Sequence, residues 1–174
     1  MLTLAILRHA KSSWDAPAAD DFSRPLAPRG IAAAPIMGRE IARLGLKPDA
    51  ILCSPAARTR ETLALAIPKI DTKHQKVLFE DDLYMASAED LLARLRRLPK
   101  ETRTALLIGH NPSLHNLALA LAGSGKPADL ADMATHFPTC ALAVIDFDLP
   151  AWRDLAVRTG KLVHFIVPRR LSQG

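Results

Sequence analysis

Short apolar segments alternate along this chain with amphipathic helical patterns, and this alternation constrains the fold more than any other feature of the sequence. One helix shows the pattern clearly, because a capping box at Ser87-Ala88-Glu89-Asp90 is followed by an apolar stripe with helical spacing. Strands that alternate with helices are typical of an α/β fold. The predicted strands are residues 2–7, 50–53, 76–79, 104–108, 141–147 and 162–167.

The length limits the number of domains. A chain of 174 residues has room for one, since domains commonly have roughly 100–200 residues. We expect residues 1–174 to form a three-layer α/β/α sandwich with a mainly parallel central sheet. The last two predicted strands are joined too closely for a crossover helix, so an antiparallel strand should lie near the edge. One helix should bury Ile31 and Ala34 and be kinked or split at Pro35, and residues 123–127 should form a loop.

The composition excludes several classes of function. Lys and Arg outnumber Asp and Glu by 23 to 18, but the basic residues are scattered and aromatic residues make up only 5%, so we expect no nucleic-acid partner. No apolar run reaches the roughly 18 residues of a membrane span, so we expect no membrane partner. The apolar residues 1–7 are interpreted as a buried strand and not as a signal peptide, which predicts a cytoplasmic location. Cys53 and Cys140 are too few for a disulfide framework or a four-ligand zinc site.

Three predicted strands end in residues suited to binding an anion. Arg8 and His9 follow the first strand, Arg58 follows the second by a few residues, and His110 follows the fourth. Ligands of open α/β sheets bind beyond the carboxyl ends of the strands, so these side chains should converge there. Two arginines and two imidazoles suit a compact dianion, and phosphate is the natural candidate.

Two helix starts should point at the same place. Ser54 and Asn111 are predicted N-caps, and Pro55 and Pro112 would then occupy the first helical position. Each helix would direct its free N–H groups and positive dipole end at the anion. A neutral imidazole in such a site can attack phosphorus and form a covalent intermediate. Nearby arginines would lower the pKa of that histidine, and a second imidazole, if charged, would bind a non-bridging oxygen and stabilise the transition state.

Together these segments resemble the phosphoglycerate-mutase-like branch of the histidine phosphatase superfamily, whose Arg-His-Gly signature has Ala10 in its third position here. The chain is similar to the small bacterial SixA-type phosphohistidine phosphatases in its short length and in two segments, residues 7–14 and residues 21–26. The resemblance covers nearly the whole chain. It rests on Leu7-Arg8-His9-Ala10-Lys11-Ser12-Ser13-Trp14, Asp21-x-x-Arg24-Pro25-Leu26, Ser54-Pro55-x-x-Arg58-x-x-Glu61-Thr62 and Gly109-His110-Asn111-Pro112.

The resemblance implies a phosphoglycerate-mutase-like fold and a role for each residue. His9 would be the nucleophile, and Arg8, Arg58 and His110 would complete the phosphate pocket. Asp82 is the best positional match to the general acid of the family. No cofactor and no metal would be required. Independently of the resemblance, Ser12 is a weaker candidate for substrate binding, and Arg24 either binds the phosphate or pairs with Asp20 or Asp21.

The function that we expect is metal-independent removal of phosphate from phosphohistidine in a protein. An imidazole leaves phosphorus far more readily than an alkoxide, so such a substrate needs little help from an acid. One alternative is a phosphomonoesterase or mutase that acts on a small phosphorylated metabolite. A second alternative is a non-catalytic module that binds phosphohistidine. The partner is therefore either a phosphorylated protein or a small phosphorylated molecule.

Overall fold

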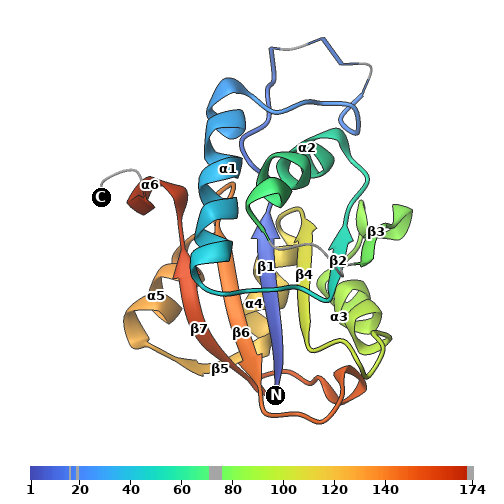
Figure 1. The fold of residues 1–174 in the computed structure, drawn as a ribbon, viewed down its shortest axis with the longest axis vertical. Helices are drawn as coiled ribbons and strands as arrows, with labels where there is room; N and C mark the ends of the chain where they lie inside the picture. The colour runs from blue at the N-terminus through green and yellow to red at the C-terminus, as the bar shows by residue number, and fades with distance from the viewer. Residues whose placement is uncertain (16, 19, 71–75, 172–174) are drawn as a thin grey trace.

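The computed structural model describes residues 1–15, 17–18, 20–70 and 76–171. Its centre is a sheet in the order β3-β2-β4-β1-β6-β7-β5 (Figure 1). β6 is antiparallel to both of its neighbours, whereas the other neighbouring strands are parallel to each other. The predicted sheet and the antiparallel last pair are confirmed. The strands are β1 (Leu2–Arg8), β2 (Ala50–Cys53), β3 (Lys76–Phe79), β4 (Thr104–Gly109), β5 (Ala122–Gly125), β6 (Leu142–Phe147) and β7 (Gly160–Ile166).

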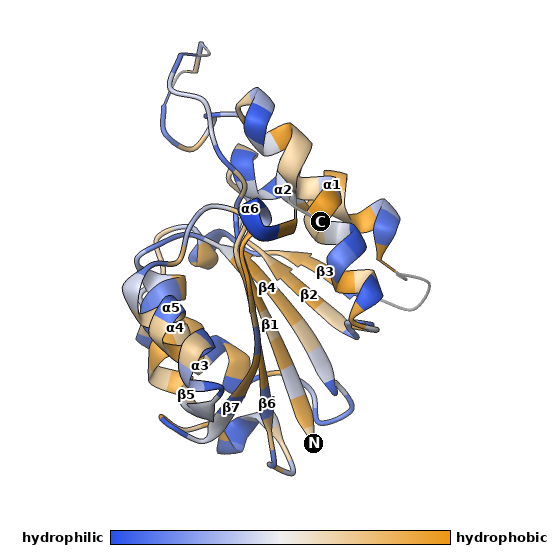
Figure 2. Ribbon diagram, turned by 90° about the vertical axis from the view of Figure 1, so that its left-hand side faces the viewer, coloured by the Kyte–Doolittle hydropathy of each residue, from blue (hydrophilic) through white to orange (hydrophobic). Residues whose placement is uncertain are grey.

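Helices cover both faces of the sheet, as the predicted sandwich requires (Figure 2). On one face lie α1 (Pro28–Arg43), α2 (Ala57–Ala66) and α6 (Pro168–Leu171). On the other face lie α3 (Ala88–Arg96), α4 (Ser113–Leu121) and α5 (Pro127–Thr135). Short 3₁₀ turns occupy Ile67–Lys69, Asp81–Leu83 and Trp152–Asp154. None of the helices in the described ranges is long and apolar enough to cross a membrane.

The central strand β1 contributes side chains to both apolar cores. Leu4 and Ile6 point into the core under α3 and α4, and Ala5 and Leu7 point into the core under α1 and α2. All four side chains are fully buried. A strand covered on both faces has a continuous apolar sequence, because neither set of alternating side chains faces water. This burial fixes the carboxyl end of β1, where Arg8 and His9 follow.

Two parts of the sequence-based prediction are wrong. Residues 122–125 form the edge strand β5, and α5 starts at Pro127, where a loop was expected. β5 escapes prediction because its sequence, Ala-Gly-Ser-Gly, has no β-branched or aromatic residue and pairs only with β7. Helix α1 is continuous from Pro28 to Arg43 and is not split at Pro35, and it leaves Ile31 48% exposed, although Ala34 is buried as expected. Gly30 belongs to the buried face of α1. A Cβ at this position would lie only 2.2 Å from the Lys11 carbonyl oxygen, so the helix packs closely against the loop after β1.

Candidate active site

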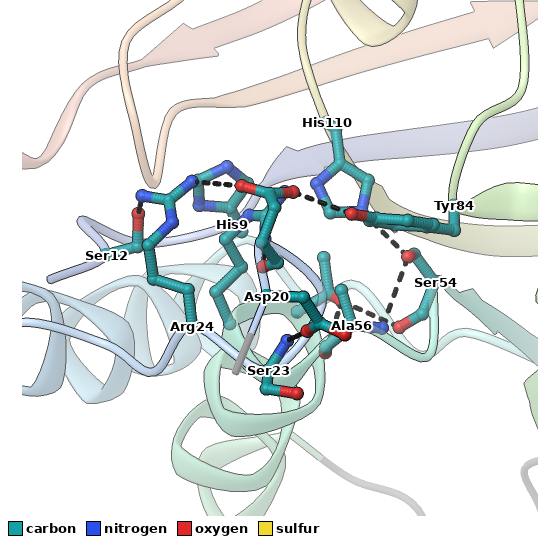
Figure 3. Close-up of polar contacts among 12 residues, drawn as sticks. His9, Ser12, Asp20, Ser23, Arg24, Ser54, Ala56, Tyr84 and His110 are labelled. Atoms are coloured by element: carbon teal, nitrogen blue, oxygen red, sulfur yellow. Dashed lines mark hydrogen bonds and ion pairs between the residues drawn. The ribbon is translucent and has the colours of Figure 1, made fainter. Parts of the chain in front are cut away.

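The sheet register brings the predicted residues to one place. β4 lies between β1 and β2, with Arg8 opposite Gly109 and Cys53 opposite Ile108. His9 and His110 therefore emerge side by side, with ring centroids 5.4 Å apart (Figure 3).

The imidazole of His9 is held in one tautomer. Its Nδ1 lies 2.7 Å from the carbonyl oxygen of Ala10, and because a carbonyl only accepts, Nδ1 carries the proton. The lone pair of the neutral ring is then on Nε2. Burial lowers the pKa of His9 to about 3, and the nearby Arg58 and Arg8 guanidiniums contribute in the same direction. His9 is thus a neutral imidazole with a free Nε2 at neutral pH, which is the state required of a nucleophile.

His110 is neutral as well, and it is held by Ser54. Its Nε2 lies 2.7 Å from the Ser54 hydroxyl oxygen, and Tyr84 packs edge-on against the ring at 5.5 Å (Figure 3). Burial lowers the pKa of His110 to about 4, and the nearby Arg58 guanidinium adds to this effect. Nδ1 of His110 is buried and has no hydrogen-bond partner within the part of the chain that the structure describes.

Ser54 and Asn111, the two predicted N-cap residues, make hydrogen bonds outside the helices. Helix α2 starts at Ala57 and α4 at Ser113, and neither helix has a side-chain cap. The Ser54 hydroxyl contacts His110, and the Asn111 amide donates to the Phe137 carbonyl oxygen at 2.9 Å. The prediction that Ser54 and Asn111 cap these helices is therefore wrong, because both side chains shape the loops around the histidines.

The two arginines of the site lie close enough to His9 for their charges to lower its pKa. Arg8 Nη1 donates to the Phe137 carbonyl oxygen at 3.0 Å, and burial lowers the pKa of Arg8. Arg58 is 6% exposed, and its Nη1 donates to the Asp21 carbonyl oxygen at 2.8 Å. The Nε atoms of both arginines are buried and have no partner among the described residues. Both guanidiniums thus keep unused donors for a bound anion.

Asp21 and Tyr84 also belong to this site. The Asp21 carboxylate accepts hydrogen bonds from Tyr84 Oη at 2.7 Å, from Arg24 Nη2 at 2.9 Å and from Arg58 Nη2 at 3.1 Å. These contacts, the Tyr84 bond above all, hold the pKa of Asp21 well below its usual range. The same bond raises the pKa of Tyr84. Sequence reasoning gave Asp21 only as a possible partner of Arg24 and missed Tyr84, which carries no spacing signal of its own.

The weaker candidates fall into two groups. Arg24 donates to the Ser12 hydroxyl as well as to Asp21, and it stacks 3.7 Å from the centroid of the Trp14 ring. Arg24 and Ser12 are therefore connected to the site by hydrogen bonds, because Asp21 also binds Arg58. The Asp82 side chain is exposed and makes no hydrogen bond or ion pair within residues 1–15, 17–18, 20–70 and 76–171. The structure does not join it to the histidines.

Thr62 connects the two halves of the site. The Ala10 N–H donates to the Thr62 hydroxyl at 2.9 Å, and that hydroxyl donates to the Arg58 carbonyl oxygen at 2.7 Å. Thr62 and Ala10 are both fully buried. One hydroxyl thus ties the loop after β1, which carries His9, to the helix that carries Arg58.

Metal ligands do not cluster in the described residues: no three His, Cys, Asp or Glu side chains there could hold an ion together. The fold and the site define an α/β protein in which two histidines and two arginines gather beyond the carboxyl ends of the parallel strands. The family follows from comparison. Residues 4–84 match the model of the histidine phosphatase superfamily (branch 1), and the chain belongs to that superfamily.

Relatives cover the chain almost completely. The uncharacterised protein ML1117 of Mycobacterium leprae is 34% identical over 167 residues, which cover 94% of this chain and 100% of that protein. A candidate phosphohistidine phosphatase SixA from Agrobacterium tumefaciens is 31% identical, with a TM-score of 0.80 over 96% of this chain and 98% of its own. The protein histidine phosphatase SixA in complex with tungstate has a TM-score of 0.78 over 98% of this chain and 99% of its own. At 22% identity this last similarity concerns the fold alone.

Proposed function

We propose that the protein removes phosphate from phosphohistidine in a protein, through a covalent intermediate on His9. The A. tumefaciens relative, a candidate phosphohistidine phosphatase, supports this proposal. The proposal includes a single domain over residues 1–174, a cytoplasmic location, and a reaction without metal or cofactor.

One observation favours this substrate. The carboxylate bound to the arginines of the site is Asp21, and its pKa is lowered, so it is ionised at neutral pH and has no proton to give. Asp82 is exposed and unconnected to the site within the described part of the chain. An ester would need a proton on its leaving oxygen, whereas the imidazole of a phosphoramidate leaves without a strong acid. The site therefore suits phosphohistidine better than a sugar phosphate.

The reaction has two steps. His9 Nε2 attacks phosphorus, the bond from phosphorus to the substrate nitrogen breaks, and the departing imidazole takes a proton from water; the hydroxide left behind takes the proton that the second step releases. Water then attacks phospho-His9, giving inorganic phosphate and neutral His9. Arg8, Arg58 and His110 bind the phosphoryl oxygens and stabilise their charge in both transition states.

Two measurements test the proposal. The first compares kcat/KM for a phosphohistidine protein with kcat/KM for a panel of sugar phosphates, and we expect the phosphohistidine protein to be preferred. The second traps the intermediate: an acid-labile phosphoenzyme should form in the unaltered protein and be absent from the His9→Ala variant. Arg58→Gln should lower turnover strongly, and Arg60→Gln is the matched control. Arg60 lies on the same helix but is exposed and stacks on Phe79.

Each alternative has its own result. Faster turnover of sugar phosphates would favour a phosphomonoesterase or mutase of small metabolites. Binding of phosphohistidine without turnover, also with an aryl phosphate, would favour a non-catalytic binding module. An acid-labile phosphoenzyme in His9→Ala would overturn the assignment of the nucleophile.

A further inference from the structure

A second hollow lies beside the site, on the α1 side of the sheet. Helix α6 packs against α1 (Figure 1), and the segment 136–140 lies next to both. Between them is a groove of about 550 Å³. We call it the α1–α6 groove. Its lining residues are Lys11, Arg29, Ala32, Ala33, Ile36, His136, Pro138, Thr139, Cys140, Val167, Pro168 and Arg169.

The charged groups of this groove are all basic. Lys11, Arg29 and Arg169 line it together with His136, and no acidic side chain does so among the described residues. None of the three cations has an ion pair or hydrogen bond from its side chain within the described ranges. The neighbouring Arg170 differs, because it is paired with Asp132 at 2.6 Å. The cations of the groove are thus available to an external anion.

The position of Arg29 is unfavourable for the isolated helix. It lies in the first turn of α1, which has no acidic residue and no side-chain cap. The positive end of the helix dipole repels a cation at this point, and an anion nearby would relieve the repulsion. Stability of α1 alone therefore does not account for Arg29.

The floor of the groove is apolar. Ala32, Ala33 and Ile36 come from α1, and Val167 from the segment before α6. The cations come from separate segments: Lys11 follows β1, Arg29 lies in α1 and Arg169 in α6. A compact anion is bound best by convergent donors. An apolar floor with a charged rim fits an extended peptide that carries both apolar and acidic side chains.

The groove shares a wall with the site. The Cys140 N–H donates to the His9 carbonyl oxygen at 3.0 Å, and the Phe137 carbonyl oxygen accepts from Arg8. The other side of this segment lines the groove. Because one extended residue spans about 3.3 Å, a few residues would lead from a phosphohistidine at His9 into the groove.

We infer that the α1–α6 groove binds an acidic segment of the phosphoprotein substrate, a few residues from its phosphohistidine. The inference rests on the proposed function, and it adds that the enzyme prefers substrates with acidic residues near the phosphohistidine. Arg29, Arg169 and Lys11 would pair with carboxylates of that segment while its apolar side chains cover the floor.

Two phosphohistidine peptides of equal length test the inference. In one the flanking residues include Asp and Glu, and in the other these are replaced by Asn and Gln. We expect kcat/KM to be about five- to tenfold higher for the acidic peptide at low salt, and the difference to shrink at about 1 M salt. Arg29→Gln and Arg169→Gln should each lower kcat/KM for the acidic peptide about threefold, and the double variant about tenfold. The neutral peptide and an aryl phosphate should be unaffected.

Arg39→Gln is the control for net charge, since Arg39 is exposed on α1 and does not line the groove. Equal kcat/KM for the two peptides would overturn the inference and leave the proposed function intact. So would equal losses in Arg39→Gln and Arg29→Gln, or loss of aryl phosphate turnover in Arg29→Gln. Failure of both peptides, with turnover of sugar phosphates, would overturn the proposed function itself and the inference with it.

Discussion

Replacement of Thr62 by valine tests whether one hydroxyl aligns the two halves of the site. Valine keeps the shape of the side chain but removes the oxygen that accepts from the Ala10 N–H at 2.9 Å. Because Ala10 is fully buried, water cannot replace that acceptor without opening the structure. The Arg58 carbonyl oxygen loses less, since it lies within helix α2, where backbone hydrogen bonds remain.

The expected cost is that of one buried, unsatisfied N–H group. Such a group costs about 1–3 kcal/mol of stability. At about 2 kcal/mol the Tm of a chain of this size should fall by about 4–8 °C. The backbone of Ala10 also orients His9, whose Nδ1 donates to the Ala10 carbonyl oxygen. A small displacement of a reacting group can cost up to about 100-fold in rate, and we expect a loss of about tenfold in kcat/KM.

Thr62→Ser is the matched control, because it keeps the hydroxyl and removes only a methyl group. Thermal unfolding, aryl phosphate turnover and hydrogen exchange of the Ala10 amide should be measured for both variants. We expect fast exchange and low activity in Thr62→Val alone. Slow exchange of that amide in Thr62→Val, together with activity equal to that of Thr62→Ser, would refute the role assigned to the hydroxyl.

Three further predictions concern the same site. The Nε2 of His9 should stay unprotonated at about pH 5 in a ¹⁵N NMR titration, because the pKa is about 3. A midpoint near the ordinary value of about 6.5 would contradict this. Since the unfolded chain binds this proton between those values and the folded chain does not, stability should fall as the pH decreases from about 6.5 toward 3. In Asp21→Asn the pKa of Tyr84 should fall, which near-ultraviolet absorbance can follow because Tyr84 is the only tyrosine, with Asp20→Asn as an unchanged control. Gly30→Ala should lower both Tm and activity, since its Cβ would meet the Lys11 carbonyl oxygen at 2.2 Å, whereas Gly109→Ala should be tolerated because its nearest contact is 3.5 Å.

The sequence was sufficient for those parts of the site that follow directly from the sheet. His9 and His110 are at the ends of parallel strands, and neighbouring parallel strands end at the same edge. Their proximity was therefore predictable from apolar runs alone. The pairing of Arg24 with Asp21 was also accessible, because the two residues are three positions apart.

The remaining contacts join residues that are far apart in the sequence, and local sequence patterns do not predict such pairs. Tyr84 contacts Asp21 across 63 positions in the sequence, and both residues lie against Arg58 in the folded protein. Ser54 and Asn111 are residue types that often cap helices. In the folded protein their side chains instead bind His110 and the Phe137 carbonyl oxygen. Local preference is a weak guide wherever a longer-range hydrogen bond is available.

The order of the strands has a consequence for synthesis on the ribosome. Among the described strands, β1 pairs only with β4 and β6, so its partners start at Thr104 and Leu142. The segment that carries His9 leaves the ribosome before β4 and β6, so it has no neighbour in the sheet until β4 has been made. Contacts between residues so far apart form slowly. A nascent chain that stops before β4 would thus expose the apolar β1, and truncated products should be aggregation-prone and inactive.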